Sequence, residues 1–184
     1  MSQIGVLSSL LARDVLAVAF FLTATWKVSH PREYIASYAR MRPAFVRGID
    51  SPARAAVVVT EFLCSCLLII SPAIHGAGQE AGPLLAVALL ILFTAALQAQ
   101  PSLSDCGCWS SPVIERVRGD IKQSLLVRNG LLLAISAVAV IPVRANVSSV
   151  VFLSSLACAV VVAPVLLELP QVLSVVRHHD QATR

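Results

Sequence analysis

Long runs of apolar residues alternate with short polar segments along the whole of this chain. A helix crosses the hydrocarbon core of a bilayer in about 20 residues, and five of the runs come close to that length. The pattern therefore predicts an all-α, polytopic membrane helix bundle that forms a single integral membrane domain. The expected spans are Ile4–Trp26, Ala55–Ile74, Leu84–Gln100, Leu125–Val143 and Val147–Leu169.

Local signals mark several span boundaries. Ser51-Pro52 combines a capping hydroxyl with a proline where the second span should begin. The connection at Arg144 is so short that the last two spans must form an antiparallel hairpin. Pro164 and Pro170 are expected to kink or end the fifth helix.

Two shorter helices are expected between the spans. Ser111-Pro112 repeats the capping device, which predicts a short amphipathic helix over residues 112–124. In the first connection, apolar residues recur at helical spacing among arginines, which fits a helix lying on the membrane surface or, equally well, an ordered cytoplasmic loop. The apolar set there is Tyr34, Ile35, Tyr38 and Met41.

Composition supports a membrane protein and excludes other classes. Hydrophobic residues make up 57% of the 184 residues and charged residues 13%, whereas soluble domains carry about 25% charged residues. The formal net charge of +4 does not come from a basic patch interleaved with aromatic residues, so nucleic-acid binding is not expected. The first residues lack the basic region of a cleavable signal, and the first span is expected to be retained.

The basic residues predict the orientation, because cytoplasmic loops are enriched in Lys and Arg. Eleven of them fall on one side of the predicted spans, in the first connection, the third connection and the C-terminal tail. The opposite side carries only Arg144. The expected location is the bacterial inner membrane, with the N-terminus outside and the C-terminus in the cytoplasm.

The most concentrated chemistry is the pair Cys106-Gly107-Cys108, which follows a polar break after the third span. Two cysteines separated by one residue close only a tight, strained disulfide, and such a bond is reactive and not structural. Glycine between them permits backbone angles that other residues resist. The same two soft thiolates would also suit a soft metal ion. The alternative is that Cys106 and Cys108 are two unrelated thiols in a loop, with no redox or metal-binding role.

Cys64 and Cys66 repeat the spacing inside the second span, where its meaning differs. Positions i and i+2 of a helix point about 200° apart, so these two thiols cannot easily bond each other. Cys64 shares a face with Glu61 and is a candidate redox or metal site, with a packed core thiol as the more common case. Cys158, alone in the fifth span, is expected only to pack.

Ionisable residues inside the spans should face the bundle interior and have partners, because charge in lipid is costly. Arg13, Asp14, Glu61 and Arg128 are the four cases. By distance from the cytoplasmic end, Glu61 is expected to pair with Arg128, with Asn129 nearby. The pair would be purely structural, or Arg128 would favour the reactive thiolate of the Cys106 loop.

Several of these residues together resemble the MauE family of methylamine-utilisation membrane proteins, which is related to the DoxX-like proteins. The resemblance covers about residues 5–142 and leaves a C-terminal helix at about 147–176. The family pattern has Phe where this chain has Trp109. The elements that carry the resemblance are Trp26-Lys27, His30-Pro31, Glu61, Asp105-Cys106-Gly107-Cys108-Trp109 and Arg128-Asn129-Gly130.

The resemblance implies a redox-associated inner-membrane protein beside a thioredoxin-like partner, linked to maturation of the disulfide-rich small subunit of methylamine dehydrogenase. It implies a role on the periplasmic face, whereas the charge count places Cys106 and Cys108 at the cytoplasmic end.

Three functional hypotheses follow. The leading one is thiol–disulfide electron transfer through Cys106 and Cys108, with Cys64 as a relay, Glu61 and Arg128 as supporting groups and a quinone as a further acceptor. Enzyme and accessory subunit are both open under this hypothesis. The second is a Cu(I) or Hg(II) transporter that uses Cys64, Cys106 and Cys108. The third is an interaction scaffold.

Overall fold

The computed structural model describes residues 3–41, 50–73, 76–99, 121–143 and 148–182, and all regular structure within these ranges is helical. Two short 3₁₀ turns, η2 (Ser71–Ala73) and η3 (Gly76–Glu80), lie between the third and fourth α-helices. The α-helices are α1 (Gln3–Ser29), α2 (Pro31–Met41), α3 (Asp50–Ile70), α4 (Ala81–Gln98), α5 (Ile121–Ala139) and α6 (Ser149–Ala182).

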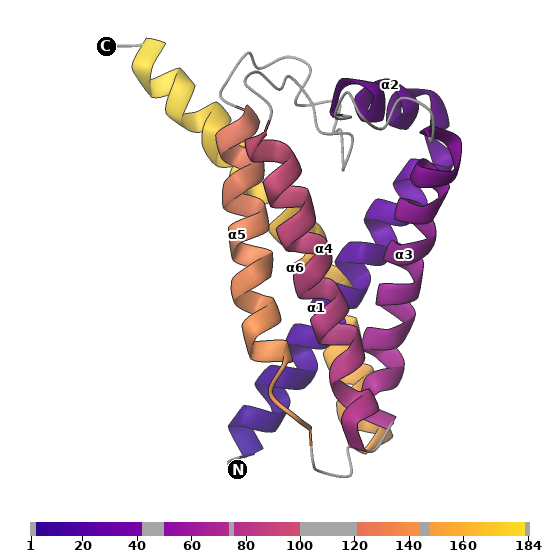
Figure 1. Ribbon diagram of the computed structural model, residues 1–184. Coiled ribbons are helices and arrows are strands. Elements are labelled where there is room, and N and C mark those ends of the chain that lie inside the picture. Colours follow the sequence, from indigo (N-terminus) through magenta and orange to yellow (C-terminus); the bar gives the residue numbers. More distant parts are fainter. Residues whose placement is uncertain (1–2, 42–49, 74–75, 100–120, 144–147, 183–184) are drawn as a thin grey trace.

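Within the described ranges, α1, α3, α4, α5 and α6 form an up-and-down bundle in which α1 is central (Figure 1). Helix α1 packs against α3, α5 and α6. Of its most apolar stretch, 56% is buried, against 17% for that of α6. The polar and charged side chains of α1 therefore meet three neighbouring helices, and this helix can organise a site inside the bundle.

The described helices confirm a helical membrane bundle. Four of them, α1, α3, α4 and α6, are long and apolar enough to cross a bilayer. The apolar part of α5, Gln123–Ala139, is shorter. Large apolar side chains remain exposed on the bundle surface, including Ile4 on α1 and Val161 on α6. A lipid environment would cover such residues without cost.

The connection after α1 contains a helix, α2, which is one of the two alternatives that the spacing of its apolar residues left open. Helix α2 lies across the end of the bundle at which α1 ends and α3 begins (Figure 1). Tyr34 is buried, and its hydroxyl donates to the backbone oxygen of Arg54, at 3.2 Å. Ile35 is exposed. Tyr34 thus ties α2 to the start of α3.

The prolines of α6 do not end it. Of the two effects expected of Pro164 and Pro170, termination is wrong, and a kink stays a prediction. Helix α6 continues through both to Ala182. Within a membrane, a helix that breaks exposes backbone groups to lipid, whereas the loss of one hydrogen bond at a proline can be accommodated locally. Pro52, in contrast, lies in the first turn of α3 as predicted.

Helices α3 and α4 approach closely at Gly82. A Cβ atom at this position would lie 2.9 Å from the backbone carbon of Leu67 and 2.9 Å from the backbone nitrogen of Leu68. Only glycine allows this approach. The contact fixes α4, which carries Phe93 and Thr94, against α3, which carries Glu61.

Candidate functional site

The centre of the candidate site is an ion pair inside the bundle. The Nζ atom of Lys27, near the end of α1, donates to Oε1 of Glu61 on α3. Both residues are almost fully buried, at 3% and 1% exposure. The Lys27 ammonium also lies 5.5 Å from the ring centre of Tyr34 and 5.3 Å from that of Phe93. Two aromatic faces and one carboxylate therefore stabilise this buried cation.

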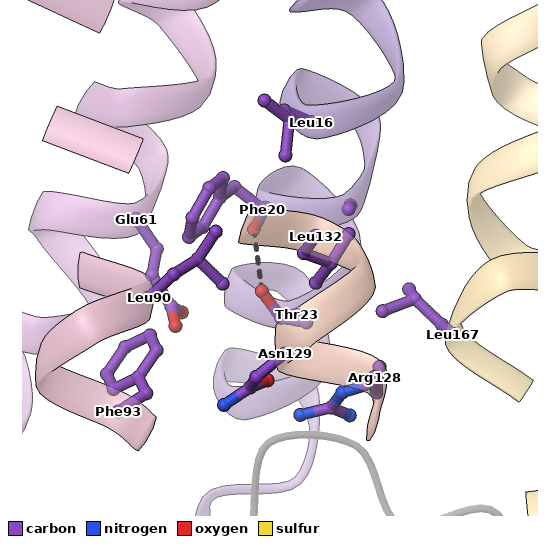
Figure 2. A pocket seen from close by; sticks show the side chains of 11 residues that line it. Leu16, Phe20, Thr23, Glu61, Leu90, Phe93, Arg128, Asn129, Leu132 and Leu167 are labelled. Atoms are coloured by element: carbon purple, nitrogen blue, oxygen red, sulfur yellow. Dashed lines mark hydrogen bonds between the residues drawn. The ribbon is translucent and has the colours of Figure 1, made fainter. Parts of the chain in front are cut away.

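A small pocket adjoins the Glu61 carboxylate. Its volume is about 30 Å³, and about 10–15 Å³ is enough for one water molecule. Figure 2 shows its polar side chains gathered toward one end, with leucine and phenylalanine side chains making up most of the remaining wall. The pocket is lined by Leu16, Ala19, Phe20, Thr23, Glu61, Leu90, Phe93, Arg128, Asn129, Leu132 and Leu167.

Helix α5 contributes Arg128 and Asn129 to the polar end of this pocket (Figure 2). Both are buried, at 4% and 2% exposure. The Nδ2 atom of Asn129 donates to the hydroxyl of Thr94 on α4, at 3.4 Å. Glu61 and Arg128 line the same pocket, and Glu61 makes an ion pair with Lys27. A direct contact between Glu61 and Arg128 stays a prediction.

Lys27 is the site residue that sequence reasoning missed. It was assigned to the first connection because the first span was expected to end at Trp26. Helix α1 instead continues to Ser29, which places Lys27 in its last turn and inside the bundle. The apolar residues that precede Lys27 and the buried glutamate of the next span were the signals available. Thr23 and Phe93 carried no comparable signal.

The cysteines of the second span follow the helical geometry. Cys64 is fully buried and Cys66 is exposed, as expected for positions on different faces of α3. The Cys64 sulfur lies 3.9 Å from the backbone oxygen of Gly82. Cys64 is thus a packed thiol on the same face as Glu61. Cys158 is exposed on the bundle surface, which corrects the expectation that it packs inside.

Cys106, Cys108 and most of the helix expected over residues 112–124 lie outside the described residues. The helices that flank the cysteine pair are described: α4 ends at Gln98 and α5 begins at Ile121. Both ends lie at the end of the bundle that carries α2 (Figure 1). Within the described part of the chain, no three His, Cys, Asp or Glu side chains are grouped so that they could hold a metal ion.

Arg13 forms a second buried polar centre, which we call the Arg13 cluster. The side chain is 0% exposed. Its guanidinium donates to the backbone oxygens of Ala139 (2.9 Å), Ile141 (3.2 Å) and Gln79 (3.3 Å) and to the Ser71 hydroxyl (3.0 Å). The expectation that Arg13 faces the interior is confirmed, and these partners are neutral oxygens.

Comparison with known proteins identifies the family of the chain. No curated protein and no solved structure matches it. Residues 6–142 match the family described as methylamine utilisation protein MauE. The match spans α1 to α5 and includes every pocket residue except Leu167, which lies on α6 beyond it. The match covers most of the chain, and the protein therefore belongs to the MauE family of membrane proteins.

Proposed function

We propose that this protein exchanges thiols and disulfides at the surface of the bacterial inner membrane, through Cys106 and Cys108 and a thioredoxin-like partner. A disulfide-rich enzyme subunit, such as that of methylamine dehydrogenase, is the kind of substrate that membership of the MauE family suggests. The charge count supports a cytoplasmic position for the cysteine pair.

The observation that carries the proposal is the position of the buried cations. Arg128 lines the pocket, and Lys27 is the ion-pair partner of Glu61, which lines it as well. Arg128 is seven residues, or about 10 Å, from the start of α5. Phe93 is five residues, or about 8 Å, from the end of α4. The chain that joins these two helix ends carries Cys106 and Cys108.

Positive charge near a cysteine favours the thiolate, which is the nucleophile of disulfide exchange. Glu61 compensates the charge of Lys27, and Arg128 adds a second cation at the pocket wall. A basic pocket at the root of a cysteine-bearing connection would stabilise a thiolate there. This is the supporting role proposed for Arg128, whereas Glu61 holds Lys27 in place and limits the positive charge of the site.

The proposed exchange proceeds in two thiolate attacks and needs no further reactant. One thiolate of the pair attacks a sulfur of the partner's disulfide, which forms a mixed disulfide and releases the partner's other sulfur as a thiolate. The second thiolate of the pair then attacks the mixed disulfide, closes the Cys106–Cys108 bond and releases the partner as a dithiol. Two electrons pass from this chain to the partner, and the reverse sequence returns them. A quinone would serve as the further acceptor: it would take two electrons and two protons from the Cys106–Cys108 dithiol, which leaves the disulfide and a quinol.

Thiol trapping in native membranes tests the proposal. Membranes are acid-quenched and alkylated with a mass tag before and after reduction. The expected result is a fraction of molecules in which Cys106 and Cys108 become tagged only after reduction. Cys106→Ser should leave Cys108 permanently taggable, whereas the matched control Cys66→Ser should not change the fraction. A pair that is fully tagged before reduction under all growth conditions would contradict the proposal.

A further inference from the structure

Asp14 is a fully buried carboxyl group in the middle of α1. Its exposure is 0%, and its side chain faces the hydroxyl of Ser155 on α6. Within the described residues, neither carboxyl oxygen makes a hydrogen bond of normal geometry, and neither does the Ser155 hydroxyl. Two polar groups that could bond each other therefore lie together between two membrane helices.

The described residues provide no cation for this carboxyl group. The adjacent Arg13 directs its guanidinium to the oxygens of the Arg13 cluster. Lys27 lies thirteen residues, or about 20 Å, further along α1 and pairs with Glu61. Arg128 lies at the pocket beside Thr23, which is nine residues, or about 14 Å, from Asp14 on α1.

The helix that covers Asp14 does not supply a charge either. Between Ser149 and Glu168, α6 contains no Lys, Arg or His. Its titratable groups in this stretch are Cys158, which is exposed, and Glu168, which is thirteen residues or about 20 Å from Ser155. On α3, Cys64 is buried against Gly82 and Cys66 is exposed. An ionised Asp14 would thus be an uncompensated charge within the membrane part of the bundle.

We infer that Asp14 is a proton-binding site at the joint between α1 and α6, occupied at neutral pH. A buried charge without a partner is far more costly than a neutral acid. The neutral acid also carries an O–H donor, and a small rotation would let it donate to the Ser155 oxygen. Loss of the proton would place a bare charge between α1 and α6 and weaken their packing.

The site lies where the family core meets an additional helix. Asp14 belongs to the residues that match the MauE family, whereas Ser155 lies beyond them. The two buried carboxyl groups of α1 and α3 consequently differ in state: Glu61 is an ion-paired carboxylate, and Asp14 is an acid. This contrast provides an internal control in one molecule.

Infrared spectroscopy of the protein in lipid vesicles tests the state of Asp14. The spectrum of the wild-type protein minus that of Asp14→Asn should contain the carbonyl band of a protonated carboxylic acid at neutral pH. Ser155→Ala should move this band to higher frequency, because the acid loses its hydrogen-bond acceptor. A difference spectrum that contains only carboxylate bands would overturn the inference.

A second measurement needs no variant. Dicyclohexylcarbodiimide adds a carboxylic acid across its C=N bond and rearranges to a stable N-acylurea, with no other reactant. In lipid vesicles it should label Asp14 at least tenfold faster than Glu61, with a rate that falls as pH rises. Equal labelling of both residues, or faster labelling of Asp14 by a water-soluble carbodiimide, would overturn the inference.

Discussion

Helix α1 carries two buried cations, Arg13 and Lys27, fourteen residues or about 21 Å apart, and their surroundings differ. Arg13 is held by neutral oxygens from η2, η3 and the end of α5. Lys27 is held by a carboxylate and two aromatic rings beside a water-sized pocket. Arg13 therefore links α1 to the segments that surround it, whereas Lys27 pairs with a carboxylate that lines a pocket.

The different surroundings of Arg13 and Lys27 indicate which residue has a structural role and which is suited to a chemical one. A guanidinium with five donors in a planar fork can satisfy several carbonyls at once, which suits a joint between connecting segments. An ammonium is a compact point charge whose protonation and position respond to its partner. A site that must stabilise a changing charge requires the second kind of group, with room beside it. The pocket is therefore the better candidate for function.

Glu61→Gln should have the largest effect on stability. The variant leaves the Lys27 ammonium buried without its counter-charge, which costs about 3–5 kcal/mol. Lys27→Met, which removes the cation that pairs with the Glu61 carboxylate, should cost a similar amount. Thermal unfolding in detergent measures both, and the double variant Lys27→Met/Glu61→Gln should recover most of the loss.

Glu61→Gln and Lys27→Met also test whether the pocket affects the cysteine pair, because the two variants change the charge near the pocket in opposite directions. Glu61→Gln makes the pocket more positive and should speed the alkylation of Cys106 and Cys108, whereas Lys27→Met should slow it. Alkylation rates in vesicles, measured below the melting temperature of each variant, give the signs. Rates that shift in the same direction would show that the pocket charge does not reach the cysteine pair.

Arg13→Met should be the next largest change. It removes its own charge and leaves neutral hydrogen-bond acceptors, and the nearby carboxylate of Glu80 is exposed to solvent, so the expected loss is about 2–4 kcal/mol. The expected loss is smaller than for Glu61→Gln because no buried charge loses its counter-charge. Alkylation rates of Cys106 and Cys108 should stay at the wild-type value. A variant that keeps its stability but loses thiol exchange would reverse the roles given to the two regions.

The fold was largely predictable from the sequence because lipid imposes a simple rule. A helix that must satisfy its backbone internally across about 20 residues leaves a long apolar run, as the runs of α1, α3, α4 and α6 show. The ends were less predictable. Helix α1 extends three residues past Trp26, and α6 continues through Pro164 and Pro170, because the packing of neighbours decides where a helix stops.

The site was predictable only in part. The rule that buried charges need partners selected Arg13, Asp14, Glu61 and Arg128, and all four are buried. The rule does not say which residues pair. Depth along each span favoured Arg128 for Glu61 and gave no reason to consider Lys27, which the extension of α1 to Ser29 brings to the same carboxylate. The partners of Arg13 are oxygens of the short turns η2 and η3 and of the end of α5, and no sequence pattern marks such oxygens.

Asn129→Leu should have the smallest effect on stability and is the most selective test of the pocket. The Asn129 amide makes a long hydrogen bond of 3.4 Å to Thr94, and its loss should cost about 0.5–1 kcal/mol.

Thr94→Val removes the same hydrogen bond, but Thr94 does not line the pocket, so it is the matched control. Both variants should melt at nearly the same temperature, whereas alkylation of Cys106 and Cys108 should slow about fivefold only in Asn129→Leu. An apolar side chain at position 129 makes the polar end of the pocket less able to support a nearby thiolate. If both variants exchange thiols at the wild-type rate, the pocket is a structural feature like the Arg13 cluster, and the comparison between the two regions loses its functional meaning.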